Sequence, residues 1–222
     1  MGPVIPEPAA IRAFPSESAF ATWLAANHAR RTEIYLRIYK KDSGRATVTY
    51  AQALDVALCW GWIDGIRKSF DEQSFLQRFT PRRPKSIWSQ VNRDHIARLT
   101  ASGRMAPPGL AQVEAAKADG RWDAAYPSGR AMTVPDDLVA AVKTEPAAWA
   151  TFQTLNRQNL FAMAFRLGNI KTAAGRTRRI AAFVEMLKEG KTFHPNRPPA
   201  KPSRRAKPAA QARTSSRSRS RH

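Results

Sequence analysis

The residues best suited to chemistry lie in one run, from Ala57 to Ser89. Asp64 interrupts an apolar segment, and Arg82, Arg83 and Lys85 follow in a turn that contains two prolines. A carboxylate in an apolar strand is partly buried or faces a cleft, so it needs a partner, and the arginines of this turn are the nearest candidates. Guanidinium groups just before a helix N-terminus suit an anion such as phosphate or carboxylate. The pattern predicts an anion-binding cleft, with a structural ion pair and a solvated basic turn as the alternatives.

Polar and aromatic side chains next to this turn extend the candidate site. Ser86 is the predicted cap of the following helix, on which Ser89 and Asn92 lie one turn apart and add hydrogen-bond donors. Tryptophans at 60, 62 and 88 form the walls of a pocket or, alternatively, part of an ordinary core. The candidate ligand-binding residues are Trp62, Asp64, Arg82, Arg83, Trp88, Ser89 and Asn92.

Patterns typical of other chemistries do not occur. The four histidines, at 28, 95, 194 and 222, are separated from each other and from the single cysteine, so a zinc site is not predicted. Gly61 to Gly65 has neither the spacing nor the lysine of a phosphate loop, and Cys59 has no histidine near it in sequence. We therefore predict no cofactor, no metal and no catalytic residue, and an enzyme acting on a small anionic substrate remains an alternative.

These residues must be positioned by a small sheet. Ser16 is the predicted cap of a helix over residues 17–29, and alternating apolar residues predict a strand over residues 33–40. Thr49 with Gln52 forms a capping box for a helix that ends near Trp60. Two further strands, over residues 62–70 and 74–80, are joined by a polar turn and predict a hairpin.

The rest of the chain has helical spacing throughout. Apolar residues three and four apart, with Pro at several starts and Gly at several ends, predict helices near residues 87–102, 107–120, 135–142, 146–155, 160–167 and 173–189. The predicted fold is α+β, with a small antiparallel sheet packed by helices and an all-helical C-terminal half. We divide the domain, residues 15–190, into an α+β part (15–103) and a helical part (104–190).

The chain is predicted to begin with a flexible arm and to end with a disordered tail. Residues 1–14 form a Pro-rich arm without periodicity, and Lys191–His222 is rich in Pro, Ala, Ser and Arg. Ten of the 37 Lys and Arg residues lie in this last segment, which has no Asp or Glu, so it carries half of the net charge of +20. Such a tail attracts nucleic acid through its charge, without reading sequence.

The predicted location is the cytoplasm. A single cysteine excludes an internal disulfide and suits a reducing compartment. The N-terminus lacks the apolar run of a signal peptide, and no segment has the length of apolar sequence needed to span a membrane. The sequence does not predict an oligomeric state.

Several motifs, in order, resemble those of a bacterial family. They are TYAQALD (49–55), ALCWGWIDG (57–65), FTPRRPKSIWS (79–89), GRMAPPGL (103–110), GRWDAAYPSG (120–129) and GRTRRIAAFVEML (175–187). Over residues 14–192 the chain resembles the YdeI/OmpD-associated, or bacteriocin-protection, family, in which Phe is common at the position of Trp60. The family's name concerns protection against antimicrobial peptides and association with an outer-membrane porin, and no reaction is attached to it.

The resemblance and the residues together give three functional hypotheses. The first is a cytoplasmic protein of the bacteriocin-protection type, non-enzymatic, with a cleft for a small anionic ligand and no membrane partner. The second is a protein that binds nucleic acid nonspecifically through residues 191–222. The third is an enzyme on a small anionic substrate.

Overall fold

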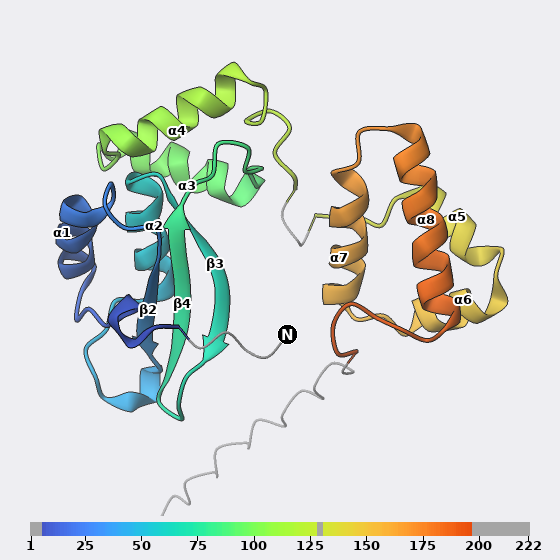
Figure 1. Cartoon of the computed structure of the whole chain (residues 1–222), viewed down its shortest axis with the longest axis horizontal. Helices are drawn as coiled ribbons and strands as arrows, with labels where there is room; N and C mark the ends of the chain where they lie inside the picture. Colours follow the sequence, from blue (N-terminus) through green and yellow to red (C-terminus); the bar gives the residue numbers. More distant parts are fainter. Residues whose placement is uncertain (1–5, 128–130, 197–222) are drawn as a thin grey trace, which may run out of the picture.

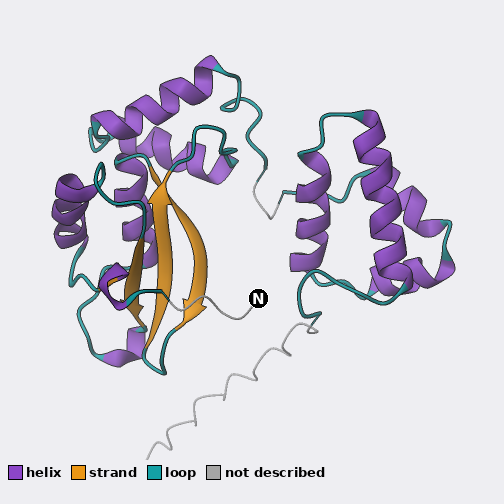
Figure 2. Ribbon diagram, in the orientation of Figure 1, coloured by secondary structure: helices purple, strands orange, loops and turns teal. Residues whose placement is uncertain are grey.

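A sheet and four helices form the first half of the chain (Figures 1 and 2). The computed structural model describes residues 6–127 and 131–196. The strands are β1 (Ile11–Arg12), β2 (Ile34–Tyr39), β3 (Trp62–Ser69) and β4 (Ser74–Pro81), and their order in the sheet is β1-β2-β4-β3. Short 3-10 helices, Pro8–Ala10 and Lys41–Ser43, precede β1 and follow β2. The predicted α+β fold is confirmed.

The predicted strands pair as an antiparallel sheet. In β2, Ile34, Leu36 and Ile38 are buried, as their alternation predicts, and β2 runs antiparallel to β4. β3 and β4 form the predicted hairpin, with a bulge between Asp64 and Arg67 that shifts the register. One strand was not predicted: β1 pairs in parallel with β2, within the segment expected to be a flexible arm.

Helices α1 (Glu17–Asn27), α2 (Tyr50–Cys59), α3 (Gln90–Ala101) and α4 (Pro107–Ala118) complete this half. Ser16 caps α1, and the predicted capping box of α2 is present, with hydrogen bonds between Thr49 and Gln52 in both directions. The predicted cap of α3 is wrong. The cap is Ser89, three residues later than Ser86, and its side chain accepts the hydrogen bond from the Asn92 amide, so the helix begins at Gln90.

One hydrophobic core joins the sheet to these helices. The largest fully buried side chains in this core include Phe20, Phe79, Trp62 and Trp88. Val113 and Ala116 of α4 lie in the same core, although α4 falls in the segment that we had grouped with the helical half.

A second hydrophobic core lies among α5 (Asp136–Lys143), α6 (Pro146–Gln153), α7 (Arg157–Gly168) and α8 (Ala173–Lys188). Figure 1 shows these helices as a cluster beyond the connector that follows α4. An ion pair between Arg176 and Asp137 ties the start of α8 to α5. The prediction of a disordered tail from Lys191 onward is wrong for its first residues, 191–196, which pack against this half. Phe193 packs edge-on against Phe183, and the Asn196 side chain accepts a hydrogen bond from the Asn156 amide. The remainder of the predicted tail, residues 197–222, lies outside the described residues.

Candidate functional site

A cleft of about 470 Å³ lies where α2, β3 and the start of α3 meet the connector after α4 and one residue of α7. Polar, apolar and aromatic side chains line it: Tyr50, Ala51, Leu54, Asp64, Ser89, Val91, Asn92, His95, Tyr126 and Phe161. Three of the seven predicted ligand-binding residues, Asp64, Ser89 and Asn92, are in this set. The cleft therefore contains part of the predicted site.

Asp64 faces the cleft from β3 and is hydrogen-bonded to α2. The hydroxyl of Tyr50 donates to Asp64 Oδ2 over 2.8 Å. Burial and the neighbouring carboxylate raise the pKa of Tyr50, so this hydroxyl keeps its proton and remains the donor. The partner predicted for Asp64 was Arg82 or Arg83. Within residues 6–127 and 131–196 the structure has no ion pair between Asp64 and either arginine, and Tyr50 takes that place.

Arg82 lies beneath an indole ring instead of in the cleft. Its guanidinium stacks on Trp88 at 3.6 Å from the ring centroid, and its Nη1 donates to Ser86 Oγ (3.1 Å) and to the Ile87 carbonyl (3.2 Å). Only 6% of the residue is exposed, and this burial lowers the pKa of Arg82 to about 10, although the group stays charged at neutral pH. Arg82 thus holds the Pro-rich loop in shape.

The other predicted residues also lie outside the lining of the cleft. Arg83 is exposed on the loop. Trp62 is buried in the core and its indole N–H donates to the His28 carbonyl, whereas Trp88 is buried against Trp122 in an edge contact. For both tryptophans the core packing considered as the alternative is the arrangement found.

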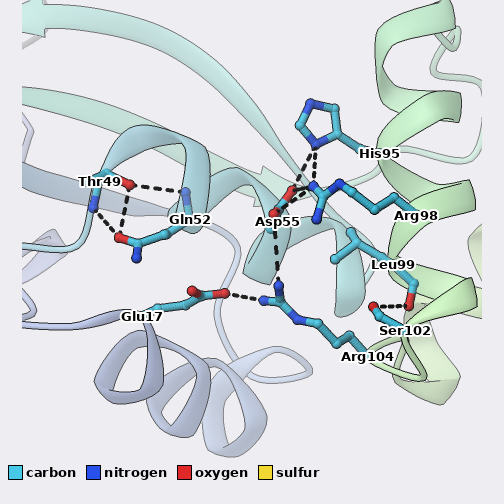
Figure 3. A network of polar contacts seen from close by, with 9 residues as sticks. All are labelled: Glu17, Thr49, Gln52, Asp55, His95, Arg98, Leu99, Ser102 and Arg104. Carbon is cyan, nitrogen blue, oxygen red and sulfur yellow. Dashed lines mark hydrogen bonds and ion pairs between the residues drawn. The ribbon is translucent and has the colours of Figure 1, made fainter.

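A polar network that the sequence did not predict links α1, α2 and α3 with the loop after α3 (Figure 3). Asp55, on α2, is only 9% exposed. His95 Nδ1 lies 2.8 Å from Asp55 Oδ1, and Arg98 Nη2 donates to both carboxylate oxygens, over 2.6 and 2.7 Å. Because His95 also lines the cleft, this network connects a buried carboxylate to the ligand-accessible surface.

The network continues to the first helix of the fold. Arg104 lies 4.0 Å from Asp55 Oδ2 and forms an ion pair with Glu17 of α1 (Figure 3). Burial alone raises the pKa of Asp55, but the hydrogen bonds from Arg98 and His95 outweigh it, so the pKa lies below its ordinary value. Asp55 is therefore ionised at neutral pH.

Asp55 is expected to contribute stability that disappears in acid. A lowered folded-state pKa means that the contribution is fully present above the unfolded pKa and is lost as the pH falls through the folded pKa. We expect the isosteric Asp55→Asn variant to be less stable than the wild type by about 2 kcal/mol at neutral pH. This difference should shrink below about pH 4, where the unfolded-state carboxyl is protonated.

Urea unfolding of both proteins in a pH series measures this difference directly. The pKa values of Asp71, Asp119 and Asp137 are also lowered, chiefly by hydrogen bonds from Ser74, Arg121 and Arg176 respectively, but these groups are the same in both proteins. Parallel stability curves, with no narrowing in acid, would show that the Asp55 network contributes nothing through its charge.

His95 and Asp55 had a weak signal in the sequence. His95 falls in the helical spacing of Val91, Ile96 and Leu99, which is typical of an apolar helix face. The informative spacing is Ser89, Asn92 and His95, at three-residue intervals, which places three polar side chains on one face of α3. Asp55 lies in an otherwise apolar helix, where a carboxylate needs a partner.

Within the described part of the chain, no group of three or more His, Cys, Asp or Glu side chains is arranged to hold a metal ion. Among the described helices, none combines the length and the apolar character needed to cross a bilayer.

Comparison with known proteins divides the chain into two matched segments. Residues 131–190, which span α5 to α8, match the model of a family described as "Bacteriocin-protection, YdeI or OmpD-Associated", so the predicted resemblance is confirmed there. Residues 12–112, which hold most of the quoted motifs and most of the cleft, match the model of a domain of unknown function (DUF8412). Neither the curated proteins nor the solved structures gave a match to this chain.

Proposed function

We propose that this protein is a cytoplasmic protein of the bacteriocin-protection type that binds a small molecule in the cleft between α2, β3 and α3. One observation carries the proposal: polar atoms without a partner converge on the same hollow. Among the described residues, no hydrogen bond is recorded for Asp64 Oδ1, His95 Nε2 or the side-chain amide of Asn92, and all three residues line the cleft. Convergent polar groups in a partly apolar hollow are typical of ligand sites.

The charge of the lining favours a neutral or cationic ligand. Asp64 is an anion, and the free atoms of Asp64 and His95 are hydrogen-bond acceptors, so they suit N–H or O–H donors on the ligand. The rings of Tyr126 and Phe161 offer apolar faces, and Tyr50 is 38% exposed. A small cyclic or aromatic molecule that carries an amine or hydroxyl groups fits these features.

An anion, the ligand expected from the sequence, is the second candidate. Ser89 and Asn92 stand at the start of α3 and can both donate hydrogen bonds toward the cleft. The arginines of the loop do not support this candidate, because Arg82 is committed to Ser86, Ile87 and Trp88. Nucleic-acid binding by the basic tail stays a prediction, since that segment lies outside the described residues.

A thermal-shift screen with small amines, polyols, nucleosides and small anions tests the ligand class. We expect an amine or hydroxyl-bearing compound to stabilise the wild type. The Asp64→Asn variant should bind it more weakly, by roughly tenfold to a hundredfold, because a hydrogen bond to a charged group contributes about 1.5–3 kcal/mol. Asp42→Asn is the matched control, since Asp42 is an exposed carboxylate that does not line the cleft.

The outcomes separate the candidates. Loss of affinity in Asp64→Asn and not in Asp42→Asn supports the cationic or neutral ligand. An anion that binds more tightly once Asp64 is neutralised favours the second candidate. Stabilising compounds whose affinity is the same in all three proteins would place the ligand outside this cleft.

A further inference from the structure

The imidazole of His95 has one nitrogen on a buried carboxylate and the other pointing away from it (Figure 3). Nδ1 lies 2.8 Å from Asp55 Oδ1 and 3.1 Å from Arg98 Nη2. The two hydrogens of that Nη2 are directed at the two carboxylate oxygens of Asp55, so none is left for Nδ1, and the contact with Asp55 assigns the hydrogen to Nδ1. Nε2 of the neutral ring then carries the lone pair. His95 is thus oriented as a base, with its free nitrogen on the side opposite Asp55.

Asp55 is placed to hold the ring of His95 in one orientation. The carboxylate is 9% exposed and accepts two hydrogen bonds from Arg98. A carboxylate that accepts from Nδ1 fixes the tautomer and the direction of the ring. Asp55 therefore has the geometry of a positioning residue for His95.

Donors lie on the same face of α3. Ser89 and Asn92 line the cleft at three-residue intervals from His95. The hydroxyl oxygen of Ser89 accepts from the Asn92 backbone amide, which leaves its own hydrogen available to donate, and no hydrogen bond is recorded for the Asn92 side chain among the described residues. A base and two donors that line one cleft are the groups that addition of water to a carbonyl requires.

We propose that the cleft hydrolyses a small neutral or cationic ester and that His95 is the general base. This inference rests on the proposed ligand site. Water attacks the ester carbonyl carbon while Nε2 takes one of its protons, and Ser89 and Asn92 donate to the carbonyl oxygen as it becomes negative. The carbonyl is then restored, the bond to the leaving oxygen breaks, and the imidazolium returns its proton to that oxygen. The products are a carboxylic acid and an alcohol, and water is the only co-reactant.

The charge of Asp64 predicts which esters the cleft prefers. A cationic ester gains from this carboxylate across the cleft, whereas an anionic ester is repelled by it. The order of reactivity is therefore cationic, then neutral, then anionic. No hydrogen bond links Ser89 to His95 among the described residues, so water and not the serine is the nucleophile.

Hydrolysis of p-nitrophenyl acetate and of acetylcholine by the full chain tests this proposal. We expect His95→Ala to lower kcat/KM by at least about a hundredfold. Free imidazole added to this variant should restore part of the acetylcholine rate, above the rate of imidazole with the substrate alone, because it replaces the missing base. His28→Ala is the matched control, since His28 contacts Trp60 away from the cleft and its loss should leave the rate unchanged.

The results distinguish this proposal from the proposed ligand site. If the wild type hydrolyses the esters no faster than His95→Ala, His95 is not a general base. This holds even if the ligand that depends on Asp64 still binds both proteins. A loss that imidazole does not restore makes His95 a structural residue and also overturns it. If the ligand shift itself does not depend on Asp64, the proposed site fails independently of any hydrolysis.

Discussion

Replacing Gly109 by alanine is expected to destabilise the first half of the protein by about 3 kcal/mol, because no space exists for a single methyl group. A Cβ at Gly109, in the first turn of α4, would lie 2.2 Å from the Cys59 carbonyl oxygen and 2.7 Å from its carbon. Both are backbone atoms at the end of α2. The clash can be relieved only by moving α4 away from α2, and the hydrogen bond from the Ala106 amide to the same carbonyl opposes that movement.

Urea unfolding of Gly109→Ala and Gly168→Ala measures this effect against a matched control. Gly168 is also in a helix, as the last residue of α7, but a Cβ there would meet nothing within 4 Å. Alanine at Gly168 should leave the protein unchanged or stabilise it by about 0.5–1 kcal/mol, because alanine loses less backbone entropy in a helix. Similar unfolding midpoints for the two variants would contradict the close packing of α2 on α4.

The fold could be predicted because its signals are local. The capping box at Thr49 and Gln52, the alternation in β2 and the prolines that open α4 and α6 each act within a few residues, and each occurs where expected. β1 gave no such signal, since its two residues are too few to show a period. The cap of α3 was misplaced for a related reason: Ser86 and Ser89 are both suitable caps, and the Pro-rich loop decides between them.

The partners within the site could not be predicted in the same way. Asp64 was recognisable as a carboxylate in an apolar strand, but Tyr50 is 14 residues away on another element. Asp55 and His95 are 40 residues apart. Such pairs depend on how α2, β3 and α3 pack together, and the residues next to them in the sequence do not predict that packing.

The basic turn shows how one stacking contact changes the interpretation of a sequence. Charge and proximity alone predicted that Arg82 pairs with Asp64 or binds an anion. In the structure, the guanidinium lies over the Trp88 ring, where weak hydration and a planar shape make arginine easier to bury than lysine. Hydrogen bonds to Ser86 and Ile87 offset part of the cost of burying the charge, although the buried Nε has no hydrogen-bond partner among the described residues. Arg82, which was predicted to bind a ligand, instead stabilises the conformation of the Pro-rich loop.

Replacing Arg82 by alanine should therefore reduce stability and leave ligand affinity almost unchanged. The variant loses a desolvated stacking contact of about 2 kcal/mol and hydrogen bonds from a charged group of about 1.5–3 kcal/mol, partly offset because no buried charge remains. We expect a net loss of about 3 kcal/mol in the free energy of unfolding. Affinity for the ligand that depends on Asp64 should change by less than about twofold, provided that the measurement is made well below the unfolding temperature.

Arg83→Ala is the matched comparison, because Arg83 is the exposed neighbour on the same loop. Its removal should change stability by no more than about 0.5 kcal/mol, as is usual for an exposed side chain. Comparison of the two variants thus shows whether the basic turn acts through the buried Arg82, which holds the loop, or through the exposed Arg83. If either variant keeps its stability but loses an anion that binds the wild type, the basic turn is a recognition element after all, and the cleft at Asp64 is not where that anion binds.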